Sequence, residues 1–255
     1  MHEVWWVAAA LFVSGFIAGL FDSIVGGGGV VTLPALLWAG LPPYMALGTN
    51  KFAGTFASSV STVAYVRSGH VERLLLSVMI PATFVGALIG ANSVLYVDQA
   101  YLKFIIFIVI LGIAILTLLR RELGRHNQFP GVTRGTVFPA LFFAFGLGFY
   151  DGFIGPGTGS FLLFGFLSLF RFDFITAAGN GRMLNFTSNA AALLLFAFRG
   201  KVVAVAGLPM AAGMLVGARA GSRLAVRRGV PLIRPLFVAV ALILAVKTGL
   251  SLFVP

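Results

Sequence analysis

The 255-residue chain contains no cysteine, only three histidines, and only seven acidic residues against eighteen lysines and arginines. The lack of cysteine excludes disulfides, thiolate metal sites and cysteine nucleophiles. His2, His70 and His126 fall at the terminus or in polar connections rather than within apolar runs. An enzyme active inside the membrane would need a nucleophile and a base within reach of each other. We therefore predict no catalytic residue, no metal and no cofactor.

Charge of either sign is also scarce, because charged residues make up 10% of the chain and hydrophobic residues 59%, with a mean hydropathy of +1.03. Soluble domains are about a quarter charged. The composition predicts an all-α polytopic membrane protein. The net charge of +11 would suit nucleic acid, but most basic residues lie in short loops between apolar runs, which is the usual topology signal of membrane proteins. We read the first apolar stretch as a membrane span rather than a signal peptide, because no basic flank precedes it.

Two apolar runs, 29–41 and 158–170, are shorter than the roughly 20 residues that a helical crossing needs. Each follows a glycine-rich break, so discontinuous helices are predicted, and whether these runs span or re-enter the membrane stays open. With the longer stretches they make about 8–10 membrane segments. The longer stretches lie at about 4–21, 44–66, 74–96, 101–119, 136–152, 175–198, 202–222 and 234–253.

The chain divides into two similar halves, a first membrane repeat over 1–119 and a second over 136–255, joined by a basic linker over 120–135. The glycine-rich segment that follows Asp22 has a counterpart after Asp151. Further matched pairs indicate the duplication of one unit: Gly19 with Gly148, Gly48 with Gly179, Lys51 with Arg182, Gly69 with Gly200, Gly86 with Gly217, and Gly90 with Gly221.

The basic linker is expected to be cytoplasmic, which places the loop from Arg67 to Arg73 on the same side. The arginines from Arg223 to Arg234 outnumber Arg199 and Lys201, so we place the former inside. This choice makes the halves inverted repeats of five segments each, with the amino terminus outside. A parallel arrangement of four crossings and one re-entrant loop per half is the alternative.

The two matched cations, Lys51 and Arg182, begin polar stripes on predicted helices and lie about 12 Å along them at 1.5 Å per residue. A charge at this depth indicates a functional site, here one that neutralises an anion. The simpler reading is that each cation forms a structural ion pair with an aspartate. Neutral donors on the same helices are Asn50, Asn185 and Asn189.

The glycine breaks suit the same ligand, because glycine exposes backbone N–H groups and the helix that follows begins with a positive dipole end. The residues expected to contribute are Gly27, Gly28, Gly157 and Thr158. Asp22 and Asp151 have coupling or structural roles: they cap the break, form a salt bridge with a cation, or carry a proton.

Motifs in both halves resemble the TauE/SafE sulfite-exporter family, also called the toluene-sulfonate uptake permeases, and especially its YfcA-like branch. In the first half they are residues 18–37 and the Leu-Gly-Thr-Asn-Lys that ends at Lys51, and in the second half residues 148–160 and 184–189. The resemblance implies transport of sulfur-containing anions across the bacterial inner membrane, in either direction. The branch commonly has lysine where this chain has Arg182.

These observations together predict a secondary transporter for sulfonates such as sulfoacetate, for sulfite or for thiosulfate, with alternating access and a site between the halves. A permease or channel for other small anions, such as carboxylates, is the alternative. The expected partners are a small anionic substrate and membrane lipid but no nucleic acid, and a homodimer stays open.

Overall fold

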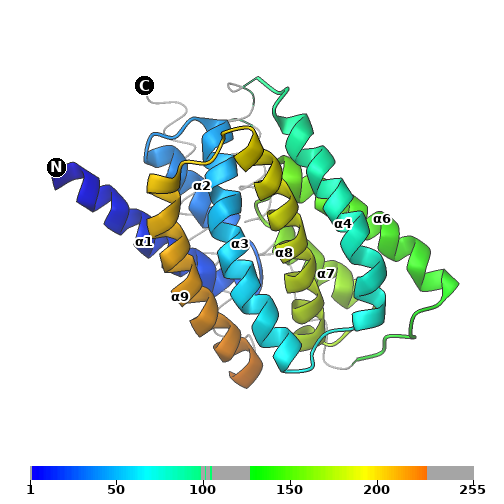
Figure 1. Ribbon diagram of the computed structural model, residues 1–255. Coiled ribbons are helices and arrows are strands. Elements are labelled where there is room, and N and C mark those ends of the chain that lie inside the picture. Colours follow the sequence, from blue (N-terminus) through cyan, green and yellow to red (C-terminus); the bar gives the residue numbers. More distant parts are fainter. Residues whose placement is uncertain (1, 99–100, 102–103, 105–126, 229–255) are drawn as a thin grey trace.

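A computed structural model describes residues 2–98, 101, 104 and 127–228. This part of the chain is helical and contains no strand, which agrees with the all-α prediction (Figure 1). The predicted span at 234–253, most of that at 101–119 and the first part of the linker, 120–126, lie outside the described residues. The helices are α1 (His2–Asp22), α2 (Gly29–Trp38), α3 (Pro43–Arg67), α4 (Arg73–Val94), α6 (Arg134–Phe153), α7 (Thr158–Ser168), α8 (Phe174–Phe198) and α9 (Ala204–Arg228).

Four of these helices, α1, α4, α6 and α9, are long and apolar enough to cross a membrane by length and composition. α3 and α8 have 25 residues each but carry the polar stripes, and they lie side by side between α9 and α4 (Figure 1). The chain is therefore a multi-pass membrane protein, and the charged residues within its two central helices, Lys51 and Arg182, are buried.

The two predicted breaks are present. α1 ends at Asp22 and the ten-residue α2 begins at Gly29, while α6 ends at Phe153 and the eleven-residue α7 begins at Thr158. Gly27 has a φ of 98° and Gly157 a φ of 77°, both in the region that side chains other than glycine rarely adopt. Glycine is thus required where the chain turns from one helix into the next.

Helix packing follows a matched pattern in which α1 lies against α9 and α6 lies against α4. Both pairs run parallel and are held by glycines at backbone contact distance. A methyl group added at Gly217 would lie 2.0 Å from the Phe16 carbonyl oxygen, and one at Gly86 would lie 2.3 Å from that of Phe145. These glycines are packing surfaces, as predicted for both glycine pairs.

At the centre, α3 and α8 pack together in antiparallel directions. Gly48, near the start of α3, approaches Lys201 just beyond the end of α8, and Gly179, near the start of α8, approaches His70 just beyond the end of α3. α3 and α8, which carry the two matched cations, thus run in opposite directions, and the inverted arrangement of the halves stays a prediction.

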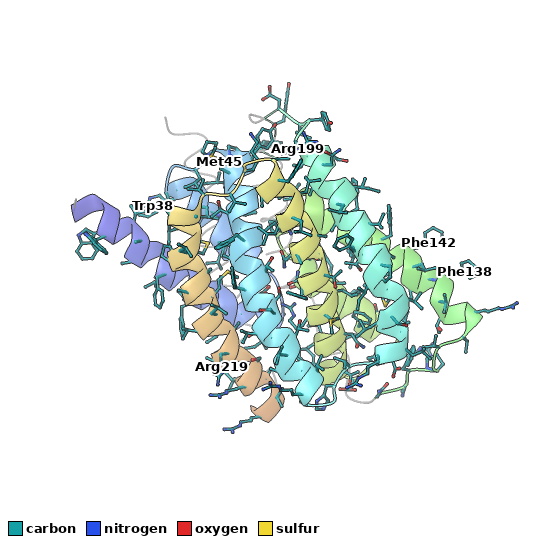
Figure 2. All side chains as sticks on the ribbon, in the orientation of Figure 1. Trp38, Met45, Phe138, Phe142, Arg199 and Arg219 are labelled. Carbon is teal, nitrogen blue, oxygen red and sulfur yellow. The ribbon has the colours of Figure 1, made fainter. Side chains whose placement is uncertain are left out.

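The basic residues are distributed unequally between the two ends of the helix bundle. The parallel pairings place the starts of α4 and α6 and the end of α9 at one end of the bundle, together with Arg67 at the end of α3. In Figure 2, Arg219 of α9 lies toward this end and Arg199 lies at the opposite end. The larger set of arginines thus lies on one side, in keeping with the predicted cytoplasmic face.

The close glycine contacts predict a sharp difference between two neighbouring positions of α6. A methyl group at Gly148 would lie 2.4 Å from the Thr83 carbonyl oxygen, whereas at Gly146 it would meet nothing within 4 Å. Gly148→Ala should therefore cost about 1–3 kcal/mol through overpacking and lower the thermal unfolding temperature in detergent. Gly146→Ala is the matched control, and an equal effect of both substitutions would contradict the packing.

Candidate substrate site at the helix breaks

Two buried ion pairs lie at the centre of the protein, and each joins a cation from one half to an aspartate from the other. Lys51 Nζ of α3 lies 2.9 Å from Asp151 Oδ1 at the end of α6. Arg182 NH1 of α8 lies 3.0 Å from Asp22 Oδ2 at the end of α1. Both cations are 1% exposed. The cluster holds two positive and two negative charges, so it is neutral as a whole.

Asp22 also bridges its own helix break. Its Oδ1 accepts a hydrogen bond of 3.0 Å from the backbone N–H of Gly28, which precedes the first residue of α2. The carboxylate thus satisfies a free donor at the positive end of α2 and pairs with Arg182 at the same time. Both structural roles considered for this aspartate, capping and salt bridging, are present.

The two breaks touch each other. A methyl group at Gly26 would lie 2.2 Å from the carbonyl carbon of Gly159, and the Ser160 hydroxyl donates to the Val25 carbonyl oxygen at 3.3 Å. A methyl group at Gly159 would also lie 2.2 Å from Arg182 NH2. The small residues therefore let two broken helices and one guanidinium meet in the middle of the protein.

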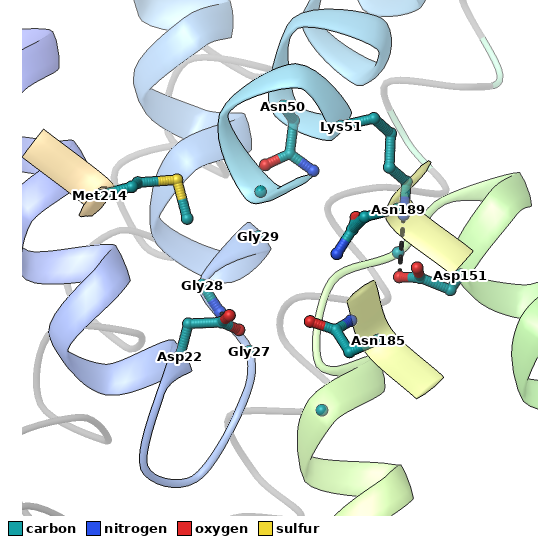
Figure 3. Close-up of a pocket in the computed structure, with 13 residues that line it drawn as sticks. Asp22, Gly27, Gly28, Gly29, Asn50, Lys51, Asp151, Asn185, Asn189 and Met214 are labelled. Carbon is teal, nitrogen blue, oxygen red and sulfur yellow. Dashed lines mark hydrogen bonds and ion pairs between the residues drawn. The ribbon is translucent and has the colours of Figure 1, made fainter. Parts of the chain in front are cut away.

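A small polar cavity of about 20 Å³ lies between the breaks and the two central helices. Figure 3 shows the amides of Asn185 and Asn189 facing it from α8 and Met214 facing it from α9. This volume suffices for a water molecule but not for a sulfonate. The lining residues are Asp22, Gly27, Gly28, Gly29, Asn50, Lys51, Gly54, Asp151, Gly155, Gly159, Asn185, Asn189 and Met214.

Most of the residues singled out in the sequence come together at this cavity. Lys51, the three asparagines, Gly27, Gly28 and both aspartates line it, whereas Arg182, Gly157 and Thr158 do not. The Arg182 guanidinium lies behind Gly159, and the Thr158 hydroxyl turns back to the Gly155 carbonyl oxygen at 2.8 Å.

Sequence reasoning missed five of the lining residues, namely Gly29, Gly54, Gly155, Gly159 and Met214. The four glycines belong to the breaks and to the polar stripe of α3, so the signal was there but did not single out the positions that face the cavity. Met214 carried no signal, because an apolar residue on an apolar helix is expected to face lipid or the core.

Lipid-spanning helices around a charged site at paired helix breaks define a polytopic membrane transporter rather than an enzyme or a soluble binding protein. The family described as Sulfite exporter TauE/SafE matches residues 11–248. The chain belongs to this family, as its motifs indicated.

Named relatives are similar over almost their whole length. The chain is 43% identical to the probable membrane transporter protein ORF9 of Sinorhizobium sp, over 94% of this chain and 91% of that protein. It is 40% identical to the probable membrane transporter protein YfcA of Escherichia coli K12, over 93% and 87%. A probable membrane transporter protein of Haemophilus influenzae is 35% identical, over 94% and 93%. No solved structure matches the chain.

The Arg182–Asp22 pair predicts a non-additive effect on stability. Asp22→Asn or Arg182→Met alone leaves an uncompensated buried charge and should cost about 3–5 kcal/mol. The double variant removes both charges and should be more stable than the sum of the single effects predicts. Thermal unfolding of the purified proteins in detergent measures the coupling, and strictly additive effects would show that the two side chains do not interact.

Proposed function

We propose that the protein is a secondary transporter that moves sulfur-containing anions across the bacterial inner membrane by alternating access. The substrate class comprises sulfonates such as sulfoacetate, together with the inorganic anions sulfite and thiosulfate. The observation that carries the proposal is the pair of buried cations, taken from different halves and held beside two helix breaks. Such charges are expensive at membrane depth, and a passing anion is the partner that explains their position.

The aspartates show what these cations can accept. A carboxylate oxygen lies 2.9 Å from Lys51 Nζ and another lies 3.0 Å from Arg182 NH1. A sulfonate or sulfite oxygen has the same charge sign and the same acceptor chemistry, so it can take the place of a carboxylate. The amides of Asn50, Asn185 and Asn189 supply neutral donors for the remaining oxygens.

Alternating access accounts for the small volume of the cavity. A site of about 20 Å³ admits a sulfonate only if the elements around it move apart. The matched contacts of α1 with α9 and of α4 with α6 support two inverted repeats that are interlocked by these helix pairs, so movement of the α1–α9 pair against the α4–α6 pair opens the site to either side. Because both ion pairs cross between the halves, such a movement changes the partners of the cations.

A binding screen of purified protein tests the site. We expect at least one of sulfite, thiosulfate, sulfoacetate, taurine and acetate to bind, and Lys51→Ala and Arg182→Ala to weaken binding by about tenfold or more. The first removes a charge-assisted hydrogen bond to the anion, and the second leaves the carboxylate of Asp22 uncompensated at the cavity. Arg67→Ala is the control, because it removes an exposed cation from the same helix as Lys51. If both alanine variants have native unfolding temperatures and bind every ligand as the parent does, the site assignment is wrong.

A proteoliposome assay separates a transporter from a channel. A transporter that alternates between two states shows saturation and counterflow exchange of labelled against unlabelled anion, whereas a channel shows neither. The carboxylate partners of both cations favour carboxylates as the second candidate substrate class. Exchange of acetate in preference to every sulfur anion would therefore replace the proposed substrate class and keep the transport role.

A further inference from the structure

The two buried ion pairs differ in how their carboxylates are satisfied. Asp22 accepts a hydrogen bond from the Gly28 N–H with Oδ1, and its Oδ2 forms an ion pair with Arg182 NH1, a nitrogen that has no hydrogen-bond partner among the described residues. Asp151 uses Oδ1 alone, to pair with Lys51. Its Oδ2 is buried and has no hydrogen-bond partner among the residues that the structure describes.

This difference decides where a proton can be placed at least cost. A buried oxygen of an ionised carboxylate that accepts no hydrogen bond is destabilising. A proton on Asp151 Oδ2 neutralises the group without displacing any donor. A proton on Asp22 would instead weaken the acceptor of a helix N-terminus. Protonation of either aspartate removes the counter-charge of its cation, so the helix N-terminus is what distinguishes the two.

The positions of the two cations also favour Asp151 over Asp22 as the residue that takes up the proton. Lys51 and Asp151 both line the cavity, whereas Arg182 lies behind Gly159. Figure 3 shows the Lys51–Asp151 contact at the edge of the space that the asparagine amides face. Lys51 is therefore the cation that a ligand in the cavity can reach.

Few other charged or titratable groups face Asp151. On its own helix Tyr150 donates its hydroxyl to the Pro156 carbonyl oxygen at 2.6 Å. Asp22 is the other acidic group at the cavity and is held by Arg182. α8 contributes neutral amides and α9 contributes Met214 at the cavity, while the sequence of α7 contains no charged residue and that of α4 contains one, Arg73 at its start.

We propose that Asp151 is the proton-coupling residue of the transporter: a proton on its Oδ2 releases Lys51 to the substrate anion, while the Asp22–Arg182 pair stays ionised. This inference rests on the proposed function and specifies how the same site couples transport to a proton. In the step, a hydronium ion loses its proton to Oδ2 and becomes water, and Asp151 becomes a neutral acid. Lys51 keeps its charge and exchanges a carboxylate oxygen for an oxyanion oxygen. No bond of the substrate forms or breaks. On release the proton leaves Oδ2 and Lys51 returns to Asp151.

The charge balance explains why proton and anion travel together. The protonated aspartate, Lys51 and one bound monoanion sum to zero, as Lys51 and the ionised aspartate do without substrate. An anion bound beside the ionised aspartate would leave one excess negative charge at membrane depth, which is costly. The loaded and unloaded sites therefore have equal net charge only if one proton accompanies each monoanion.

The test compares Asp151→Asn with its counterpart Asp22→Asn. Binding of two monoanions, methanesulfonate and acetate, and of two dianions, thiosulfate and sulfoacetate, to purified protein is measured between about pH 5.5 and pH 8. Linkage to one proton predicts that the affinity of the parent for a monoanion rises about tenfold for each pH unit of acidification. Asp151→Asn mimics the neutral acid, so it should bind well at every pH, with a change of less than about twofold over the same range.

The same proteins are then reconstituted into liposomes with each ligand that the parent binds. Asp151→Asn should retain counterflow exchange but lose accumulation driven by an inward proton gradient. Asp22→Asn should either fail to fold, seen as a lowered unfolding temperature, or fold and keep the pH dependence of the parent.

Five results would overturn the inference. Four concern the aspartates: pH-independent binding by the parent, unchanged pH dependence in Asp151→Asn, loss of exchange in a well-folded Asp151→Asn, and loss of proton-driven accumulation with retained exchange in Asp22→Asn instead. The fifth is accumulation driven by a sodium gradient at equal pH on both sides, which would make sodium the coupling ion. If the parent binds none of the ligands, the proposed function itself fails, and the inference fails with it.

Discussion

The arrangement of the whole protein depends on two ion pairs that exchange partners between its halves. Lys51 pairs with Asp151 and Arg182 pairs with Asp22, all of them shielded from water and lipid. Four isolated charges would not be tolerated at this depth, but two close pairs are, provided that the elements that carry them are held in register. The glycine contacts between α1 and α9 and between α4 and α6 provide that register.

The helix breaks bring the pairs together. Each aspartate is at or near the end of a long helix, and a glycine-rich turn then starts a short helix. At the first break the Gly28 N–H donates back to Asp22. The breaks would be unstable in contact with lipid, but here they contact each other and Arg182. Charge, broken helix and close packing are thus parts of one arrangement, and each requires the other two.

Much of this arrangement could be predicted from the sequence. The duplicated aspartate, glycine segment and cation identified the breaks and the charged residues, and the spacing of Gly86, Gly90, Gly217 and Gly221 identified packing surfaces. The sequence left the pairing open, because the spacing within one half says nothing about which half supplies the partner of Lys51. It also suggested equal roles for Lys51 and Arg182, whereas the structure places only the former at the cavity. The difference arises from Gly159, whose lack of a side chain lets the guanidinium lie behind the break.

A structure of the protein with a bound sulfur anion tests the central claim most directly. The account predicts that an oxygen of the anion lies about 3 Å from Lys51 Nζ and that Asp151 has moved away from this nitrogen. An anion bound elsewhere in the protein, with the contact between Lys51 and Asp151 unchanged, would contradict it.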